Sequence, residues 1–449
     1  MTDTNSGTGR ELVTDHDQAD DGPLRTIEFD QLTDREPSTI PIVPSAPMAN
    51  GDSIPTAFDP VALRRGRLER LRAMMGERGY DALVLLDPYN QRYATGSRNM
   101  FGYFLRNSTR YFLVMRDGPV ILFEYPGSAH VSTWLETIDE SRTSKIVWSA
   151  VNQRDDVSAD PFGQEIADLM QTHCSGRSIG LDRCTLGLAR SLEAHGLDVR
   201  DCMQDTLHCR RIKTAEEVAC LAQSMASSEA AVARVEAMLR PGLTENDLFA
   251  EMYGEVIRQG GEFIETRLIS SGPRTNPWFN EASDRVIRPG ELVALDTDTI
   301  GCHGYYSDFS RTFHVGPGKP TAYQRMLYQM AWDQVHHNMS ILKPGMNFRE
   351  IAENAWPIPE RFVDRRYPSI IHGVGMHGET PLVAHAMDFD RFSRDDMLEP
   401  GMVVSVESYI GEVGGSDGVK LEEEVLITET GIEKISRYPY DEALLGREV

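Results

Sequence analysis

Residues 418–425 read GVKLEEEV, so Glu422 directly follows a largely apolar run. Working outward from this stretch, MVVSV precedes Glu407 and LVAL precedes Asp296. Short apolar runs of this kind predict buried strands. A buried carboxylate without a partner costs several kcal/mol, so several such acids in one core predict that cations lie among them.

Three more candidate ligands lie in the same half of the chain. Hard or borderline divalent metals prefer carboxylate oxygens with an occasional imidazole, and a carboxylate that bridges two metals explains why many acids are present. The alternative is a set of salt-bridged core acids, but the nearby basic residues, Arg311 and Lys420, are too few to neutralise them. The sequence therefore predicts a two-metal site with six ligands: Asp296, Asp298, Asp308, His372, Glu407 and Glu422.

Length and charge restrict the classes of partner. The chain has 449 residues and a formal net charge of -24 at pH 7. This length predicts two domains, because domains typically hold about 100 to 200 residues. The negative charge argues against nucleic acid and anionic membranes, both of which it repels. A small molecule is the expected substrate.

The sequence favours a cytoplasmic location. No apolar run approaches the roughly 20 residues that span a bilayer. The first residues, MTDTNSGTGRELVTD, lack the basic and apolar parts of a secretory signal. Six cysteines without metal-type CxxC pairs indicate free thiols in a reducing compartment.

Composition divides the first half of the chain. Residues 1–58 form an acidic leader, which is expected to be disordered or extended because it carries many charges and few aromatic residues. Residues 59–210 alternate helix and strand patterns and predict an α/β domain. Within it, residues 61–79 predict a helix ending at Gly79, and a strand pair is expected to turn at Asp117-Gly118.

The remaining segment, 211–449, predicts an α+β catalytic domain. Thr214 with Glu217 forms a candidate capping box for a long helix, and Thr244 with Asp247 marks the start of the next. A further helix pair is expected near residues 321–355, and strands are expected around the ligand segments.

Four stretches together resemble the pita-bread metalloenzymes, which include methionine aminopeptidases, Xaa-Pro dipeptidases and creatinase. They are GYYSDFSRTFHVG (304–316), HGVG (372–375), EPGMVVSVE (399–407) and VKLEEEVLITETGIEKIS (419–436). The resemblance covers roughly residues 60 to 440. It implies a creatinase-type first domain, marked by DPYNQRYATG (87–96), and a pita-bread catalytic domain. It also implies a homodimer in which the N-terminal domain of one subunit closes the active site of the other.

The resemblance places the metal ligands of the family on Asp296, Asp308, His372, Glu407 and Glu422. Asp296 and Asp308 are twelve residues apart, one more than is usual in the hydrolases, and Asp298 is an additional acid. Iron, manganese, zinc, cobalt and nickel all suit such ligands.

The segment before the first ligand departs from the peptidases of the family. Those enzymes carry an accessory histidine there, whereas SGPRTNPWFNEAS (271–283) has Trp278 and Phe279 instead. A quaternary ammonium or sulfonium ion can be held by charge and by the face of an aromatic ring. We therefore expect both aromatic residues to bind substrate.

Within the pita-bread group, three segments are similar to the dimethylsulfoniopropionate lyases. They are GGEFIETRLISSGPRTNPWF (260–279), the D-x-D at 296–298 and GVKLEEEVLITETG (418–431). The resemblance implies cleavage of a C–S bond, with release of dimethyl sulfide and acrylate, and it implies iron as the metal.

The expected base is missing from this chain. The lyases have an aspartate six residues after the ligand histidine, where this chain has Gly378. His377 and Glu379 flank that position, and with Tyr367 they are the candidate catalytic residues.

Two other functions remain open at this point. One is hydrolysis of an amide or C–N bond, as in an Xaa-Pro dipeptidase, a creatinase or an ectoine hydrolase. The other is a binding protein without activity, which the complete ligand set disfavours.

Overall fold

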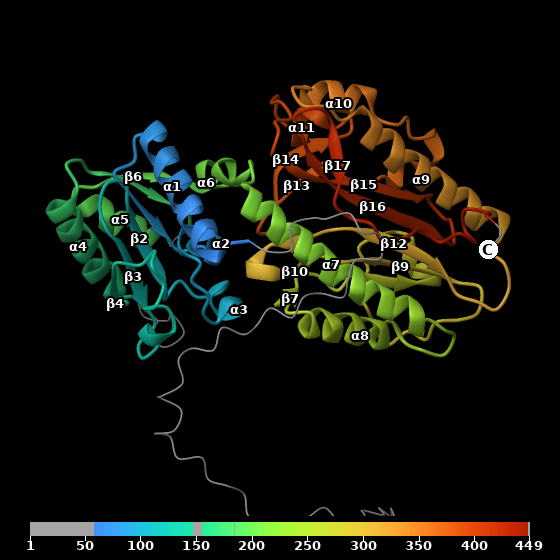
Figure 1. The fold of residues 1–449 in the computed structure, drawn as a ribbon, viewed down its shortest axis with the longest axis horizontal. Coiled ribbons are helices and arrows are strands. Elements are labelled where there is room, and N and C mark those ends of the chain that lie inside the picture. The colour runs from blue at the N-terminus through green and yellow to red at the C-terminus, as the bar shows by residue number, and fades with distance from the viewer. Residues whose placement is uncertain (1–57, 147–154, 184, 448–449) are drawn as a thin grey trace, which may run out of the picture. The chain divides into compact units, whose positions relative to one another are not determined.

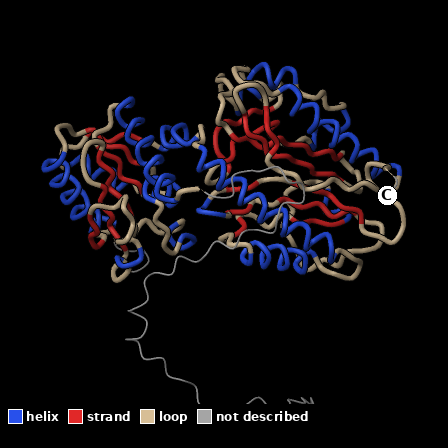
Figure 2. The backbone as a smooth tube through the Cα atoms, in the orientation of Figure 1, coloured by secondary structure: helices blue, strands red, loops and turns tan. Residues whose placement is uncertain are grey.

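The computed structural model describes residues 58–146, 155–183 and 185–447 (Figures 1 and 2). The acidic leader predicted over residues 1–58 therefore lies almost wholly outside the described residues. The described parts all belong to one unit of mutually contacting residues. None of the described helices combines the length and the apolar character of a membrane-spanning segment.

The first helix forms where the sequence predicts it. Helix α1 spans Pro60–Arg78. The Asp59 carboxylate accepts a hydrogen bond from the Val61 amide at its N-terminus, and Gly79 ends it with φ 72°. That left-handed conformation has little steric cost for glycine, which explains the choice of residue.

The N-terminal domain contains a mixed six-stranded sheet in the order β4-β3-β2-β1-β5-β6. The strands are β1 (Ala82–Leu85), β2 (Tyr111–Met115), β3 (Val120–Glu124), β4 (Glu140–Thr143), β5 (Ser178–Leu181) and β6 (Asp198–Asp201). β2 and β3 pair antiparallel around Asp117-Gly118, which confirms the predicted turn. The other helices of this domain are α2 (Pro88–Thr95), α3 (Phe101–Phe104), α4 (Asp155–His173), α5 (Leu186–Ala194) and α6 (Met203–Arg210).

Helices of the second domain begin at the predicted caps. Both capping boxes, Thr214 with Glu217 and Thr244 with Asp247, are present. The helices are α7 (Ala215–Met238), α8 (Glu245–Arg258), α9 (Ala322–Ile341), α10 (Phe348–Asn354) and α11 (Phe389–Phe392). The short 3-10 helices of the described chain are η2 (Ala129–Val131), η3 (Gly272–Thr275), η4 (Cys302–Gly304) and η5 (Glu360–Arg365).

Three sheets form the centre of the catalytic domain, in the orders β11-β10-β7, β12-β9-β8 and β14-β13-β15-β16-β17. The first two contain β7 (Phe263–Ile264), β8 (Ile269–Ser271), β9 (Leu292–Asp296), β10 (Thr299–Ile300), β11 (Tyr306–Ser307) and β12 (Ser310–His314). The third contains β13 (Ser369–Val374), β14 (Gly378–Ala384), β15 (Val403–Gly411), β16 (Gly418–Ile427) and β17 (Ile432–Lys434). Helices α9 and α10 cover the five-stranded sheet, and α7 and α8 lie on the side of β9 and β12 (Figure 1). Figure 2 shows the strands between these helices.

Strand register places the candidate ligands at the centre of this domain. Glu407 of β15 lies directly opposite Glu422 of β16. Asp296, at the end of β9, lies opposite Ser310 of β12, and Ser310 donates a hydrogen bond of 2.8 Å to Glu422. The two sheets therefore meet at the candidate ligands.

Candidate metal centre

One histidine joins acids from three separate segments. His372 Nε2 lies 3.2 Å from Asp308 Oδ2, 3.2 Å from Glu407 Oε1 and 3.6 Å from Glu422 Oε1. Burial alone would lower the pKa of His372, but contacts with these carboxylates raise it well above its ordinary value. The structure thus brings together residues that lie far apart in the sequence.

The fully buried Lys420 lies among the remaining ligands. Its Nζ is 2.6 Å from Glu407 Oε2, 2.7 Å from Glu422 Oε2 and 3.4 Å from Asp296 Oδ2. Although burial alone would lower the pKa of Lys420, these three carboxylates raise it well above its ordinary value, so the side chain stays charged. Arg311, the other basic residue near these acids in the sequence, pairs with Glu423 at 2.9 Å.

The remaining acids lack enough positive charge. Burial raises the pKa of Asp296, of Asp308 and of Glu407. Burial and the neighbouring Asp296 raise the pKa of Asp298 to about 8. Glu422 differs, since Lys420 and His372 outweigh burial and lower its pKa. Crowded carboxylates with this pattern favour a cation that neutralises them.

Asp298 is held in an unusual backbone conformation. Its φ is 38°, in the left-handed region that residues with a side chain rarely adopt. Thr266 and Tyr306 donate hydrogen bonds from their hydroxyl groups to its two carboxylate oxygens. These contacts fix the carboxylate close to Asp296.

The donor set fits divalent metal ions. Two groups of residues could each hold an ion, Asp308/His372/Glu422 and Asp296/Asp298/Asp308. Within each group, the ligand atoms lie within 4.8 Å of one another. Asp308 belongs to both groups, as a bridging carboxylate would. Among the described residues, Asp308 Oδ1 and Glu422 Oε1 are buried without a hydrogen-bond partner. Buried oxygens are rarely left unpaired, and a cation would satisfy them.

Sequence reasoning missed Glu424. Its Oε2 accepts a hydrogen bond of 3.0 Å from the Asp308 amide, and its Oε1 is also buried without a partner. Burial raises the pKa of Glu424 well above its ordinary value. Alternation along a strand places residues 422 and 424 on one face, so the triple glutamate contained the signal.

Three aromatic side chains lie beside the acids. Lys420 Nζ is 5.9 Å from the centre of the Trp278 ring and 4.7 Å from that of Tyr367. Phe279 lies 5.5 Å from Tyr367, ring to ring, and its side chain is 56% exposed. Trp278 is buried and also packs against Tyr409. The predicted substrate-binding residues thus adjoin the predicted metal ligands.

The two residues that flank Gly378 both contact basic side chains. Glu379 is buried, and it pairs with Arg210 at 2.9 Å and with Lys213 at 3.4 Å. Arg210 Nη2 lies 2.9 Å from His377 Nε2. Because arginine can only donate, that ring nitrogen accepts, and the proton lies on Nδ1, 2.6 Å from the Gly378 carbonyl. Burial and Arg210 lower the pKa of His377.

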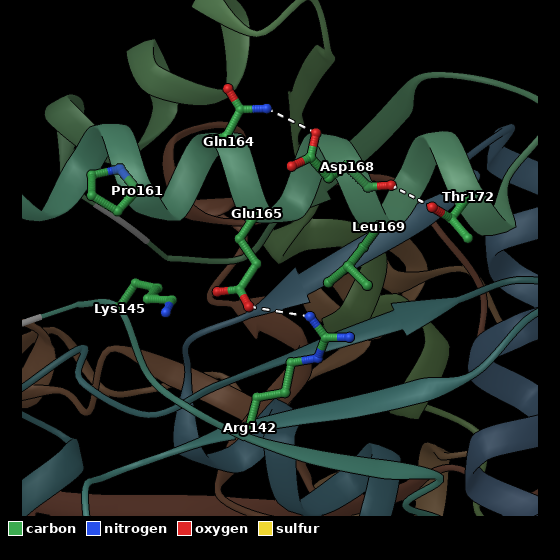
Figure 3. A pocket seen from close by; sticks show the side chains of 8 residues that line it. All are labelled: Arg142, Lys145, Pro161, Gln164, Glu165, Asp168, Leu169 and Thr172. Atoms are coloured by element: carbon green, nitrogen blue, oxygen red, sulfur yellow. Dashed lines mark hydrogen bonds and ion pairs between the residues drawn. The ribbon is translucent and has the colours of Figure 1, made fainter.

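A hollow of about 370 Å³ lies in a different part of the molecule (Figure 3). It is bordered by α4 and the end of β4, where Glu165 pairs with Arg142 at 3.2 Å and Gln164 donates to Asp168. No candidate ligand or catalytic residue lines it. The hollow is therefore separate from the carboxylate site.

Comparison with known proteins supports both domains. The model of metallopeptidase family M24 matches residues 219–429, and that of the creatinase/prolidase N-terminal domain matches residues 67–212. A dimethylsulfoniopropionate lyase, DddP, from Roseovarius nubinhibens is 38% identical over 392 residues, which make up 86% of this chain and 88% of that protein.

Solved structures confirm the fold. An Xaa-Pro dipeptidase from Bacillus anthracis matches with a TM-score of 0.66 and 23% identity, over 84% of this chain and 99% of that one. A prolidase from Pyrococcus horikoshii OT3 matches with a TM-score of 0.67 and 20% identity, over the same shares, 84% and 99%. The predicted order, a creatinase-type domain followed by a pita-bread domain, is therefore confirmed.

Proposed function

The chain belongs to metallopeptidase family M24, and we propose that within this family it is a metal-dependent lyase acting on a small sulfonium zwitterion. The substrate is dimethylsulfoniopropionate or a close relative, and the products are dimethyl sulfide and an unsaturated acid. The observation that carries the proposal is the aromatic group Trp278, Phe279 and Tyr367 beside the carboxylate site. Similarity to the lyase from Roseovarius nubinhibens supports it.

Six residues of this chain would hold two divalent metals. They are Asp296, Asp298, Asp308, His372, Glu407 and Glu422. When bound, such metals would neutralise the substrate carboxylate and so make the adjacent C–H bond more acidic. We infer iron as the metal, with manganese, zinc, cobalt or nickel as the other ions that these ligands suit.

The aromatic residues would hold the other end of the substrate. A sulfonium has no hydrogen to donate, so the ring faces of Trp278 and Phe279 supply attraction that a polar side chain could not. Tyr367 lies between Phe279 and Lys420 and borders the same space. Its pKa is raised well above the ordinary value by burial, so its hydroxyl stays protonated and can donate to an anionic group.

His377 and Glu379 have a positioning role in this proposal. A base needs a free lone pair, and Arg210 occupies the one on His377 Nε2. Glu379 is neutralised by Arg210 and Lys213. Both residues therefore hold the loop around Gly378 against the segment that joins the two domains.

We further propose that the chain acts as a homodimer in the cytoplasm. The family resemblance implies a site closed by the partner's N-terminal domain. Light scattering coupled to size-exclusion chromatography should give the mass of two chains.

Hydrolysis of an Xaa-Pro peptide is the second candidate, because the solved structures that share the fold include an Xaa-Pro dipeptidase and a prolidase. The deciding assay incubates metal-loaded protein with dimethylsulfoniopropionate and measures dimethyl sulfide in the headspace. A parallel reaction contains Gly-Pro or Ala-Pro. Release of dimethyl sulfide without dipeptide cleavage supports the lyase, and dipeptide cleavage alone supports the hydrolase. Asp308→Ala is the control that should be inactive in both.

A further inference from the structure

Glu265 adjoins the candidate metal centre, although nothing in the ligand pattern includes it. Its backbone amide donates a hydrogen bond of 2.8 Å to the Asp298 carbonyl. The next residue, Thr266, holds the Asp298 carboxylate. Glu265 itself is exposed. Its side chain is therefore accessible from solvent, on a segment whose backbone is bonded to that of a candidate ligand.

A tyrosine from the N-terminal domain fixes the Glu265 carboxylate. The Tyr89 hydroxyl, on α2, donates a hydrogen bond to Glu265 Oε1. The Tyr89 ring also contacts the His377 ring, with 4.6 Å between centres. Burial raises the pKa of Tyr89 above its ordinary range, so its hydroxyl acts as a donor. Tyr89, Glu265 and His377 thus converge from three separate segments.

Open space lies beside Gly378, which is next to His377. A Cβ atom added at Gly378 would meet no other atom within 4 Å. The first atom of a side chain can therefore be added at this position without displacing its neighbours.

Two other acids near Gly378 and Tyr89 already form ion pairs with basic residues. Glu262 accepts from Arg92 and also pairs with Arg98 at 3.2 Å. Glu379 pairs with Arg210 and Lys213. Within the described residues, by contrast, Glu265 makes no ion pair, and a neutral hydroxyl is its side-chain partner.

We propose that Glu265 is the general base of the lyase reaction, an inference that rests on the proposed function. The Glu265 carboxylate takes the proton from the carbon next to the substrate carboxylate. The electron pair of that C–H bond forms the C=C bond, and the C–S pair leaves with sulfur as dimethyl sulfide. The proton then passes from Glu265 to water, which restores the carboxylate. No oxidant or reductant is needed.

The test compares wild type, Glu265→Gln and the double variant Glu265→Gln/Gly378→Asp, all loaded with metal. Glutamine keeps the acceptor for Tyr89 but cannot take a proton, so turnover of dimethylsulfoniopropionate should fall at least about a hundredfold. Metal content, measured by elemental analysis, should not change. The double variant should regain activity, because an aspartate at 378 places a carboxylate in the adjoining open space. Glu353→Gln, an exposed residue on α10, is the matched control.

Three results would overturn the assignment. They are full activity in Glu265→Gln, loss of metal in that variant, or a double variant no more active than the single one. A wild type that releases no dimethyl sulfide would instead refute the proposed function. The two failures are therefore distinguishable.

Discussion

Replacing Lys420 with methionine should destabilise the metal-free protein strongly. The ammonium group is fully buried and lies 2.6 Å, 2.7 Å and 3.4 Å from the carboxylates of Glu407, Glu422 and Asp296. Methionine keeps most of the length of the side chain but removes the charge, so three buried acids lose their shared counter-ion. Removing one partner of a buried ion pair costs about 3–5 kcal/mol. For a domain of about 200 residues, that loss corresponds to a Tm lower by roughly 6–20 °C.

The measurement is calorimetric or urea unfolding of protein freed of metal with a chelator. Adding divalent metal should then reduce the loss of unfolding free energy caused by Lys420→Met, because the metal supplies positive charge to the same carboxylates. Lys434→Met is the matched control, since Lys434 pairs with Glu423 at 3.3 Å but its side chain is 38% exposed. Such a pair contributes about 0–1 kcal/mol. A metal-free Lys420→Met variant that unfolds within about 1 kcal/mol of wild type would refute the reasoning.

Three further predictions address the ligands, the aromatic residues and the N-terminal domain. Asp308→Ala or Glu407→Ala should release metal and abolish activity, and full metal content by elemental analysis in either variant would contradict the ligand assignment. Trp278→Ala should raise KM for a sulfonium substrate about 5- to 30-fold, equivalent to about 1–2 kcal/mol, with metal retained; an unchanged KM in a folded variant would leave Trp278 only a packing role. Burial, with Asp87 beside it, raises the pKa of Asp182 to about 7. The native state therefore keeps a proton that the unfolded state has lost, and this carboxyl lowers stability as pH rises from about 4 to 7. Asp182→Asn should make the decline of unfolding free energy with pH shallower by up to about 1.4 kcal/mol per pH unit. An unchanged slope in urea titrations across this window would show that Asp182 does not cause the decline.

Locally encoded features could be predicted from the sequence. Gly79 ends α1 because a left-handed residue is needed there, and the capping box of Thr214 and Glu217 lies within four residues. The apolar run before Asp296 forms β9, and the run before Glu407 forms the beginning of β15. In each case the signal and its effect lie within one element.

Partners from distant segments could not be predicted in this way. The sequence counts Arg311 and Lys420 alike as the basic residues near the ligand acids, yet of these two only Lys420 contacts their side chains. Arg311 reaches Glu423, which the strand turns to the opposite side from Glu422. Likewise, no periodicity shows that Arg210 will meet Glu379, because that contact depends on how two domains pack.

The buried pairing of Arg311 with Glu423 favours the correct register of β16 at the candidate metal centre. Successive residues of β16 point to opposite faces of the sheet. If β16 paired one residue out of register, Glu423 would take the place of Glu422 at the site. Arg311, fully buried, would then lose its partner. Because the candidate ligands come from segments that are distant in the sequence, metal should bind tightly only after β16 has joined the sheet in the correct register. Metal uptake during refolding would thus report a late step, the completion of the catalytic domain.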